Sequence, residues 1–163
     1  MTREERLKYL INYLLNEKPE YSNINIPESV EEKKQLLRSL MNVRPPSDIS
    51  HEFLLVQNQY LLQEIIKKGI TNVNDLTPIK EKIYLWQGDI TTLRCDAIVN
   101  AANNRLLGCF VPCHECIDNA IHTYAGIQLR LACDKIMKSK NSFAGTGSAE
   151  ITQAYNLPSD YII

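Results

Sequence analysis

The sequence lacks long apolar runs and carries almost no net charge. Its 163 residues have a formal net charge of -1, and no apolar stretch approaches the length of a membrane-spanning helix. A near-balance of charge gives no electrostatic reason to expect nucleic acid or an acidic membrane as a partner. Internal repeats and low-complexity tracts are also absent. With 44% hydrophobic and 23% charged residues, the composition is that of a soluble globular protein.

The cysteines do not have the pattern of a disulfide framework. There are five of them, an odd number, and three lie close together. The first ten residues, MTREERLKYL, are charged from the third position, which is unlike a signal peptide. We therefore expect a protein of the cytoplasm, with no membrane partner.

The first part of the chain has the periodicity of three amphipathic helices. They are predicted over 3–17, over a segment that begins after Ser29 with a capping box to Glu32, and from about 50 to 68. No residue here is a candidate for chemistry. The apolar residues expected on the buried faces are Leu7, Leu10, Ile11, Leu14, Leu15, Leu36, Leu37, Leu40, Met41, Phe53, Leu54, Leu61, Leu62, Ile65 and Ile66.

From about residue 72 onward the pattern changes to that of an α/β sheet. Strands are predicted over 83–86, 97–99 and 149–154, and a helix from about 117 to 137. Such sheets bind ligands at their strand ends. The last three residues read as the opening of a further strand, with no turn or cap after them. We therefore expect the sequence to be a fragment.

The stretch GCFVPCHECIDNAIH, residues 108–122, concentrates thiols and imidazoles. Cys109, His114 and Cys116 offer three ligands within eight residues, a donor set suited to zinc. Three protein ligands leave one coordination position open, as in reactive zinc sites. Cys113 is a fourth candidate, although its place beside His114 and after Pro112 disfavours the same ion. The alternative is that these are ordinary reduced cysteines in a loop.

Asp118 falls in the first turn of the helix that follows this loop. The helix dipole alone favours an acid there. The free N–H groups of Ile117, Asp118 and Asn119 at the same helix start form a site that binds phosphate readily. His122 lies four residues beyond Asp118 on the same helix face. It is either a base or, more commonly for such a residue, a structural histidine.

Polar residues also follow two predicted strands. Asp89 comes after the first, and Asn100 and Asn103 after the second. A carboxylate at a strand end can accept from the amino group of a nucleobase, and an asparagine amide can bind ribose hydroxyls or a reacting water. The structural alternatives are an N-cap or turn role for Asp89 and turn formation for the asparagines.

Three segments together are recognisable. GDITTLRCDAIVNAANNRLLG, IDNAIHTYAG and GTGSAEITQAYNLPSDYII resemble the macrodomain family of ADP-ribose-binding proteins. In most macrodomains a glycine-rich run precedes the helix. The sequence GCFVPCHECIDN in its place is similar to the zinc-containing macrodomains of bacteria and fungi, which also carry a helical N-terminal extension. On this basis we predict an extension over 1–79 and an incomplete macrodomain over 80–163.

The resemblance implies a three-layer α/β/α sandwich, of class α/β, and a hydrolase that removes mono-ADP-ribose from modified protein side chains. It implies that Asp89 and Ile90 bind adenine, with a second phosphate-binding loop beyond residue 163. It implies that Asn100, Asn103 and Asp118 lie at the distal ribose and take part in its reaction. It implies that Ile117 and Asn119 bind ADP-ribose. The implied zinc ligands are Cys109, His114 and Cys116.

The resemblance also implies partners. In bacteria such proteins are often encoded beside a sirtuin-type ADP-ribosyltransferase and a lipoyl-carrier protein, so a modified carrier protein is a plausible substrate. The competing interpretation is a reader module that binds ADP-ribosylated proteins without cleaving them, with a structural zinc.

Overall fold

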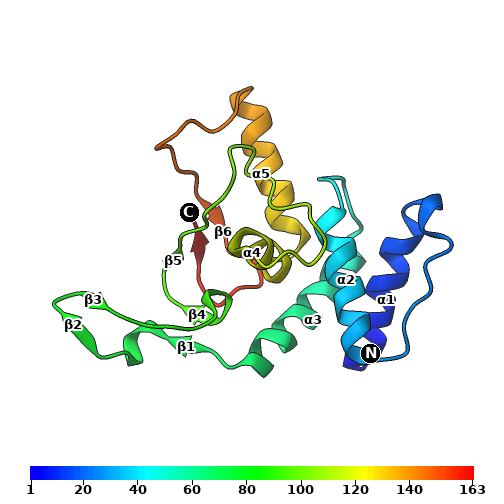
Figure 1. The fold of residues 1–163 in the computed structure, drawn as a ribbon, viewed down its shortest axis with the longest axis horizontal. Helices are drawn as coiled ribbons and strands as arrows, with labels where there is room; N and C mark the ends of the chain where they lie inside the picture. Colours follow the sequence, from blue (N-terminus) through cyan, green and yellow to red (C-terminus); the bar gives the residue numbers. More distant parts are fainter.

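The computed structural model describes residues 1–163. Three helices of the N-terminal part lie side by side, and small sheets and two further helices form the rest (Figure 1). No helix combines the length and the hydropathy needed to span a membrane. The helices and 3-10 turns are α1 (Arg3–Asn16), η1 (Pro19–Tyr21), α2 (Val30–Val43), α3 (His51–Lys68), η2 (Val73–Asp75), η3 (Ile90–Thr92), α4 (Ile117–Ala125) and α5 (Ile127–Lys140). The strands are β1 (Thr71–Asn72), β2 (Pro78–Lys80), β3 (Ile83–Tyr84), β4 (Leu93–Arg94), β5 (Ala97–Ile98), β6 (Thr152–Gln153) and β7 (Tyr161–Ile162).

Helices α1, α2 and α3 confirm the three predicted amphipathic helices. Each begins at a side-chain cap, in which Thr2, Ser29 or Ser50 accepts a backbone N–H of the first turn. The prediction of burial is wrong for two residues, Leu62 and Ile66, which are 51% and 59% exposed. The buried residues of this core are Leu7, Leu10, Ile11, Leu14, Leu37, Leu40, Met41, Phe53, Val56, Tyr60, Leu61 and Ile127.

The predicted strand over 83–86 is wrong in length and in place. Only Ile83 and Tyr84 form a strand, β3, which pairs antiparallel with β2 in an exposed hairpin away from the main sheet. Leu85 is 79% exposed, so this apolar run has no core to enter among the described residues. Separately, β1 and β4 pair in parallel.

The main sheet has the order β5-β7-β6, with β7 in the centre. β7 runs parallel to β5 and antiparallel to β6, so the last residues do form a strand, as predicted. The strand predicted over 149–154 is shorter than expected, since only Thr152 and Gln153 pair with β7. Helices α4 and α5 pack on this sheet, with Ile65 of α3 in the same core. The core residues are Ile65, Ile98, Ile121, Ala125, Leu129, Cys133, Ala154, Leu157 and Ile162.

The single helix predicted over 117–137 is two helices that meet at Gly126. Gly126 has φ of 96°, which an L-residue rarely adopts. A Cβ atom there would lie 2.7 Å from Gln57 Nε2 and 2.7 Å from Gln128 Oε1. The chain therefore turns at the one residue that permits both the conformation and the close approach of α3.

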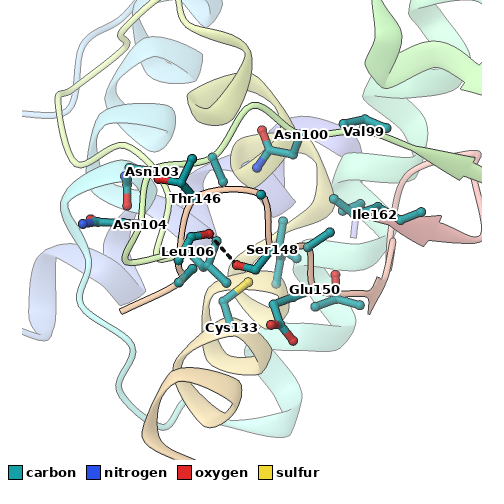
Figure 2. A pocket seen from close by; sticks show the side chains of 18 of the residues that line it. Val99, Asn100, Asn103, Asn104, Leu106, Cys133, Thr146, Ser148, Glu150 and Ile162 are labelled. Atoms are coloured by element: carbon teal, nitrogen blue, oxygen red, sulfur yellow. Dashed lines mark hydrogen bonds between the residues drawn. The ribbon is translucent and has the colours of Figure 1, made fainter. Parts of the chain in front are cut away.

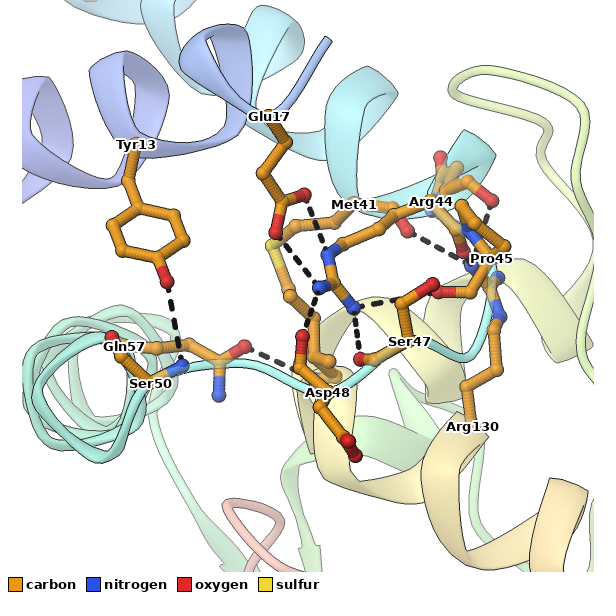
Figure 3. A network of polar contacts seen from close by, with 12 residues as sticks. Tyr13, Glu17, Met41, Arg44, Pro45, Ser47, Asp48, Ser50, Gln57 and Arg130 are labelled. Carbon is orange, nitrogen blue, oxygen red and sulfur yellow. Dashed lines mark hydrogen bonds and ion pairs between the residues drawn. The ribbon is translucent and has the colours of Figure 1, made fainter.

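Two buried arginines join the N-terminal helices to the remainder (Figure 3). The Arg130 guanidinium of α5 donates to the carbonyl oxygens of Met41, Asn42 and Arg44 at the end of α2, and to Leu107. The Arg44 guanidinium in turn pairs with a carboxylate of α1 and donates to the backbone of the 45–48 turn. The helical part is therefore packed tightly against the part with the sheet.

Candidate metal centre and ligand site

The three predicted metal ligands lie together. The ligand atoms of Cys109, His114 and Cys116 are within 4.8 Å of one another. Cys116 is the N-cap of α4, and its Sγ accepts the backbone N–H of Asn119 at 3.4 Å. Burial raises the pKa of the Cys116 thiol, and the neighbouring Cys109 adds to that shift.

This donor set fits zinc. In a tetrahedral site with ordinary zinc–sulfur and zinc–nitrogen lengths, ligand atoms lie roughly 3.5 Å apart, so side-chain adjustments of about an ångström would close the cluster on one ion. Two thiols and an imidazole are the ligands that zinc prefers. The three side chains would leave a fourth position open.

Cys113 faces away from this cluster. Its Sγ lies 3.2 Å from Ser39 Oγ and 3.4 Å from the carbonyl oxygen of Gln35, both on α2. Its φ is 51°, in the left-handed region, and this conformation directs the thiol toward the helical extension. The structure thus separates Cys113 from the three ligands, as its position beside His114 indicated.

Asp118 is buried beside the cluster and hydrogen-bonded to Asn100. The residue is 5% exposed, and Asn100 Nδ2 donates to Oδ1 at 2.9 Å. Burial raises the pKa of Asp118, against the opposing effects of that hydrogen bond and of the Arg130 charge. Asn100 Oδ1 is buried and has no hydrogen-bond partner. A buried acceptor of this kind is rare in proteins and is ready to accept from a ligand hydroxyl.

His122 is buried and packs against Asp118 inside the fold. Its Nε2 lies 3.6 Å from Asp118 Oδ1. Burial, with the Arg130 charge in addition, lowers the pKa of His122 to about 3, so the ring is neutral. Gly108, with φ of 79°, lies directly on this ring, and a Cβ atom there would be 2.7 Å from the ring carbon Cγ. The backbone just before Cys109 therefore rests on the imidazole.

Asn119 is not a free group at the helix start, contrary to the prediction. It is fully buried, and its backbone N–H is already donated to Cys116. Its side chain donates to the Val111 carbonyl at 3.0 Å and accepts from Arg38. Ile117, by contrast, is 37% exposed.

Asp89 and Ile90 lie in a separate corner, at η3. Asp89 Oδ1 accepts the backbone N–H and the hydroxyl of Thr91, and Lys68 Nζ of α3 lies 2.8 Å from Oδ2. Desolvation raises the pKa of Asp89, but the hydrogen bonds from Lys68 and Thr91 outweigh it, so the pKa is lowered overall. Lys68 Nζ also lies 3.3 Å from the centroid of the Tyr124 ring. Asp89 is therefore the N-cap of η3, which was the structural alternative to ligand binding. Its carboxylate is nevertheless charged and partly exposed.

A cavity of about 390 Å³ opens between the segment after β5 and the turn that precedes β6 (Figure 2). Asn100 and Asn103 line one side, and Thr146 and Ser148 line the other. Asn103 also holds its own turn, because its Oδ1 accepts the backbone N–H of Arg105 at 2.9 Å. Asp118 and the three ligands do not line this cavity. The predicted site residues therefore fall into three neighbourhoods, and the contact between Asn100 and Asp118 links two of them, the metal loop and the cavity.

Sequence reasoning missed the residues that hold the metal loop from outside. Arg38 and Asn42 of α2 contact this loop across more than 70 positions of sequence. Arg130 of α5 contacts Leu107, just before the loop, across 23 positions. A signal was present in the pattern, because Asn42 and Arg130 follow directly on buried apolar residues of their helices. Polar residues at such positions need partners inside the fold.

Comparison with known families adds to this geometry. Residues 99–163 match the family model described as Macro domain. This part of the chain is therefore similar to the Macro domain family. It contains every predicted site residue except Asp89 and Ile90. The predicted α/β class, with N-terminal helices before the macrodomain, is confirmed, whereas the boundary at residue 80 stays a prediction.

Relatives match over nearly the whole chain. A protein of Treponema medium named "Protein-ADP-ribose hydrolase" is 52% identical over all of this chain and 64% of its own length. A protein of the same name from Staphylococcus aureus (strain MRSA252) is 47% identical over 99% of the chain and 61% of its own length. A Fusarium oxysporum f. sp. cubense protein, "Probable bifunctional ADP-ribose hydrolase/ADP-ribosyltransferase", is 38% identical over 77% of the chain and 23% of its own length. The chain thus spans less than two thirds of the length of these relatives, and its macrodomain lies at the end of the matched region.

Proposed function

We propose that the protein to which this chain belongs is a zinc-dependent hydrolase that removes mono-ADP-ribose from modified protein side chains. The observation that carries the proposal is the pair formed by Asn100 and Asp118. A buried carboxylate, two residues after Cys116 in the sequence, is held by an amide whose oxygen has no partner, and Cys116 is one of three clustered metal-ligand candidates. The names of the relatives support the same chemistry.

In this proposal the reaction is hydrolysis at the anomeric carbon of the distal ribose. Water forms a bond to that carbon, the bond to the protein side chain breaks, and the departing group takes up a proton. Asp118 accepts the proton of the attacking water or orients that water. Asn100 keeps the carboxylate in place through Nδ2 and accepts a ribose hydroxyl on Oδ1, while Asn103 contacts the ribose from the cavity side.

Zinc fits the three ligands, Cys109, His114 and Cys116, and when bound it would supply Lewis-acid polarisation of a water or a ribose hydroxyl. Ile117 and Asn119 complete the helix start beside the ligand, Asn119 as a support because its polar groups are engaged. Asp89, with Ile90 beside it, accepts a hydrogen bond from the amino group of adenine. Its exposed carboxylate, kept ionised by Lys68, suits that role.

We propose a modified lipoyl-carrier protein as the first substrate to test, with a sirtuin-type ADP-ribosyltransferase as the enzyme that modifies it. The name of the Fusarium relative joins a hydrolase and a transferase, which supports a pairing of the two activities. The five cysteines are all free thiols, in keeping with the reducing cytoplasm.

The test measures zinc content and ADP-ribose release together, on the purified protein with a mono-ADP-ribosylated carrier protein. We expect one equivalent of zinc and steady release, both lost in Cys109→Ser and Cys116→Ala. Cys113→Ser is the matched control, because its thiol faces α2, and it keeps both. Zinc with ADP-ribose binding but no release would favour the reader module. Neither zinc nor binding would overturn the proposal.

A further inference from the structure

Helix α2 of the N-terminal extension contacts the metal loop, residues 109–116, through a specific polar interface. The Arg38 guanidinium donates from Nη2 to the carbonyl oxygen of His114 at 2.9 Å. It also donates to Asn119 Oδ1, from Nε at 3.1 Å and from Nη2 at 2.7 Å. One half-buried side chain of α2 therefore contacts the main chain of one proposed ligand, His114, and the side chain of Asn119, whose backbone N–H bonds a second ligand, Cys116.

Asn119 carries this contact to both sides of the loop. Its backbone N–H donates to Cys116 Sγ, and its side-chain Nδ2 donates to the carbonyl oxygen of Val111. Since Asn119 is fully buried, its amide has no solvent to replace these partners. Arg38 fixes the orientation of that amide by occupying its oxygen twice.

The segment between the ligands is held by the next turn of α2. Asn42 Oδ1 accepts the backbone N–H of Cys113 at 3.0 Å, and Asn42 Nδ2 donates to Thr123 Oγ1 of α4 at 3.0 Å. Cys113 has φ of 51°, a left-handed conformation that non-glycine residues adopt only where the surrounding structure holds them in it. This strained residue directly precedes His114, so its conformation determines where the imidazole is placed.

We propose that Arg38, assisted by Asn42, is a positioning residue for the metal loop. By this inference α2 holds the loop in the shape in which its three ligands face one ion, and the helical extension is part of the site. The inference rests on the proposed zinc-dependent function. Outer hydrogen bonds of this kind pre-orient metal ligands, and their loss typically lowers metal affinity by about 10- to 100-fold.

The experiment measures the dissociation constant for zinc by competition with a chromophoric chelator, in the full-length protein. We expect Arg38→Ala to weaken zinc binding by about 10-fold or more. Arg38→Lys restores part of the affinity, because an ammonium reaches one of the two acceptors but cannot span both. Lys34→Ala is the matched control on α2, since Lys34 pairs with Glu64 and not with the loop, and it leaves zinc affinity unchanged.

Thermal unfolding of the metal-free proteins, in the same samples, separates positioning from plain stability. Zinc affinity that is lower in Arg38→Ala than in the wild type, at a temperature below the unfolding transitions of both proteins, supports the inference. Equal affinity in the wild type and Arg38→Ala, whatever the change in stability, overturns the inference alone. Failure of the wild type to bind zinc overturns the proposed metal site and the inference with it. If Arg38→Ala does not fold, Arg38→Lys makes the same comparison with an expected loss of about 3-fold, and equal affinity there also overturns it.

Discussion

The metal-loop end and the Asp89 end of the proposed site hold their carboxylates in opposite ways. Asp118 is 5% exposed and is bonded to a neutral amide, and burial raises its pKa. The Asp89 side chain is 44% exposed and pairs with Lys68, and its pKa is lowered. A buried carboxylate whose pKa is raised by desolvation is suited to proton transfer, whereas an exposed, paired carboxylate stays charged and accepts hydrogen bonds. Under the proposed function, chemistry and recognition are then located at separate ends of the site.

The largest effect is expected from Asp118→Asn. If Asp118 handles the proton of the attacking water, ADP-ribose release falls by about 10²- to 10⁴-fold, while affinity for free ADP-ribose changes little. Release is followed on the modified carrier protein, and affinity by calorimetry. An equal loss of release in Asp89→Asn would break the distinction between the two ends.

The next effect tests how firmly the metal-loop end is anchored. Arg130→Met leaves the carbonyl oxygens of Met41, Asn42, Arg44 and Leu107 without their donor, so the free energy of unfolding falls by about 2–4 kcal/mol. Chemical denaturation measures it. Lys138→Met, on the exposed face of the same helix, changes stability by less than about 0.5 kcal/mol. Similar small losses in both variants would contradict a firmly anchored end.

Asp89→Asn probes recognition. Because a hydrogen bond to a charged acceptor contributes about 1.5–3 kcal/mol, we expect affinity for ADP-ribose to fall by about 10-fold or more, with release at saturating substrate nearly unchanged. Calorimetry with ADP-ribose gives the affinity. Asp96→Asn, an exposed acid on the link to β5, is the control. Unchanged affinity in Asp89→Asn would remove Asp89 from the ligand site.

The smallest effect concerns Lys68→Met. The exposed pair of Lys68 and Asp89 contributes under about 1 kcal/mol to stability. Because the pKa of Asp89 is lowered on folding, this contribution is present above the unfolded pKa and is lost as the pH falls through the folded one. The difference in the free energy of unfolding between wild type and variant is first measured by denaturation at neutral pH. It should shrink when the pH is lowered below 3.8, the ordinary pKa of an aspartate side chain. A difference in stability that stays constant with pH would show that it comes from the contact of Lys68 with Tyr124 and not from the pair with Asp89.

Local patterns in the sequence predicted what local physics determines. Helix caps, amphipathic periodicity and the close spacing of Cys109, His114 and Cys116 all require only near neighbours in the chain, and each is found in the structure. The strand at 83–86 was overestimated because an apolar run becomes a long strand only where a sheet is there to receive it.

Long-range contacts explain the other misses. Gly126 interrupts a continuous helical pattern because Gln57, from a distant helix, occupies the space beside it. The side chain of Asn119 is also held from a distance, because Arg38 of α2 donates to its Oδ1, whereas its backbone N–H is taken by the N-cap Cys116 nearby in the chain. Local spacing can place a metal ligand, but it cannot identify the side chain from another helix that supports it.

The contact of Gly108 with the His122 ring has a consequence for how freely the metal loop can vary. Cys109 follows a backbone seated on that ring, and Cys116 caps the same helix, so α4 sets the spacing between the first and last ligands. The exposed side chains of Val111, Pro112 and Glu115 contribute nothing to that spacing. Substitution of these three side chains should therefore leave the loop in place, whereas Gly108 has to remain glycine. Under the proposed function, the outer face of the loop can then vary with the protein that is recognised while the three proposed ligands keep their places.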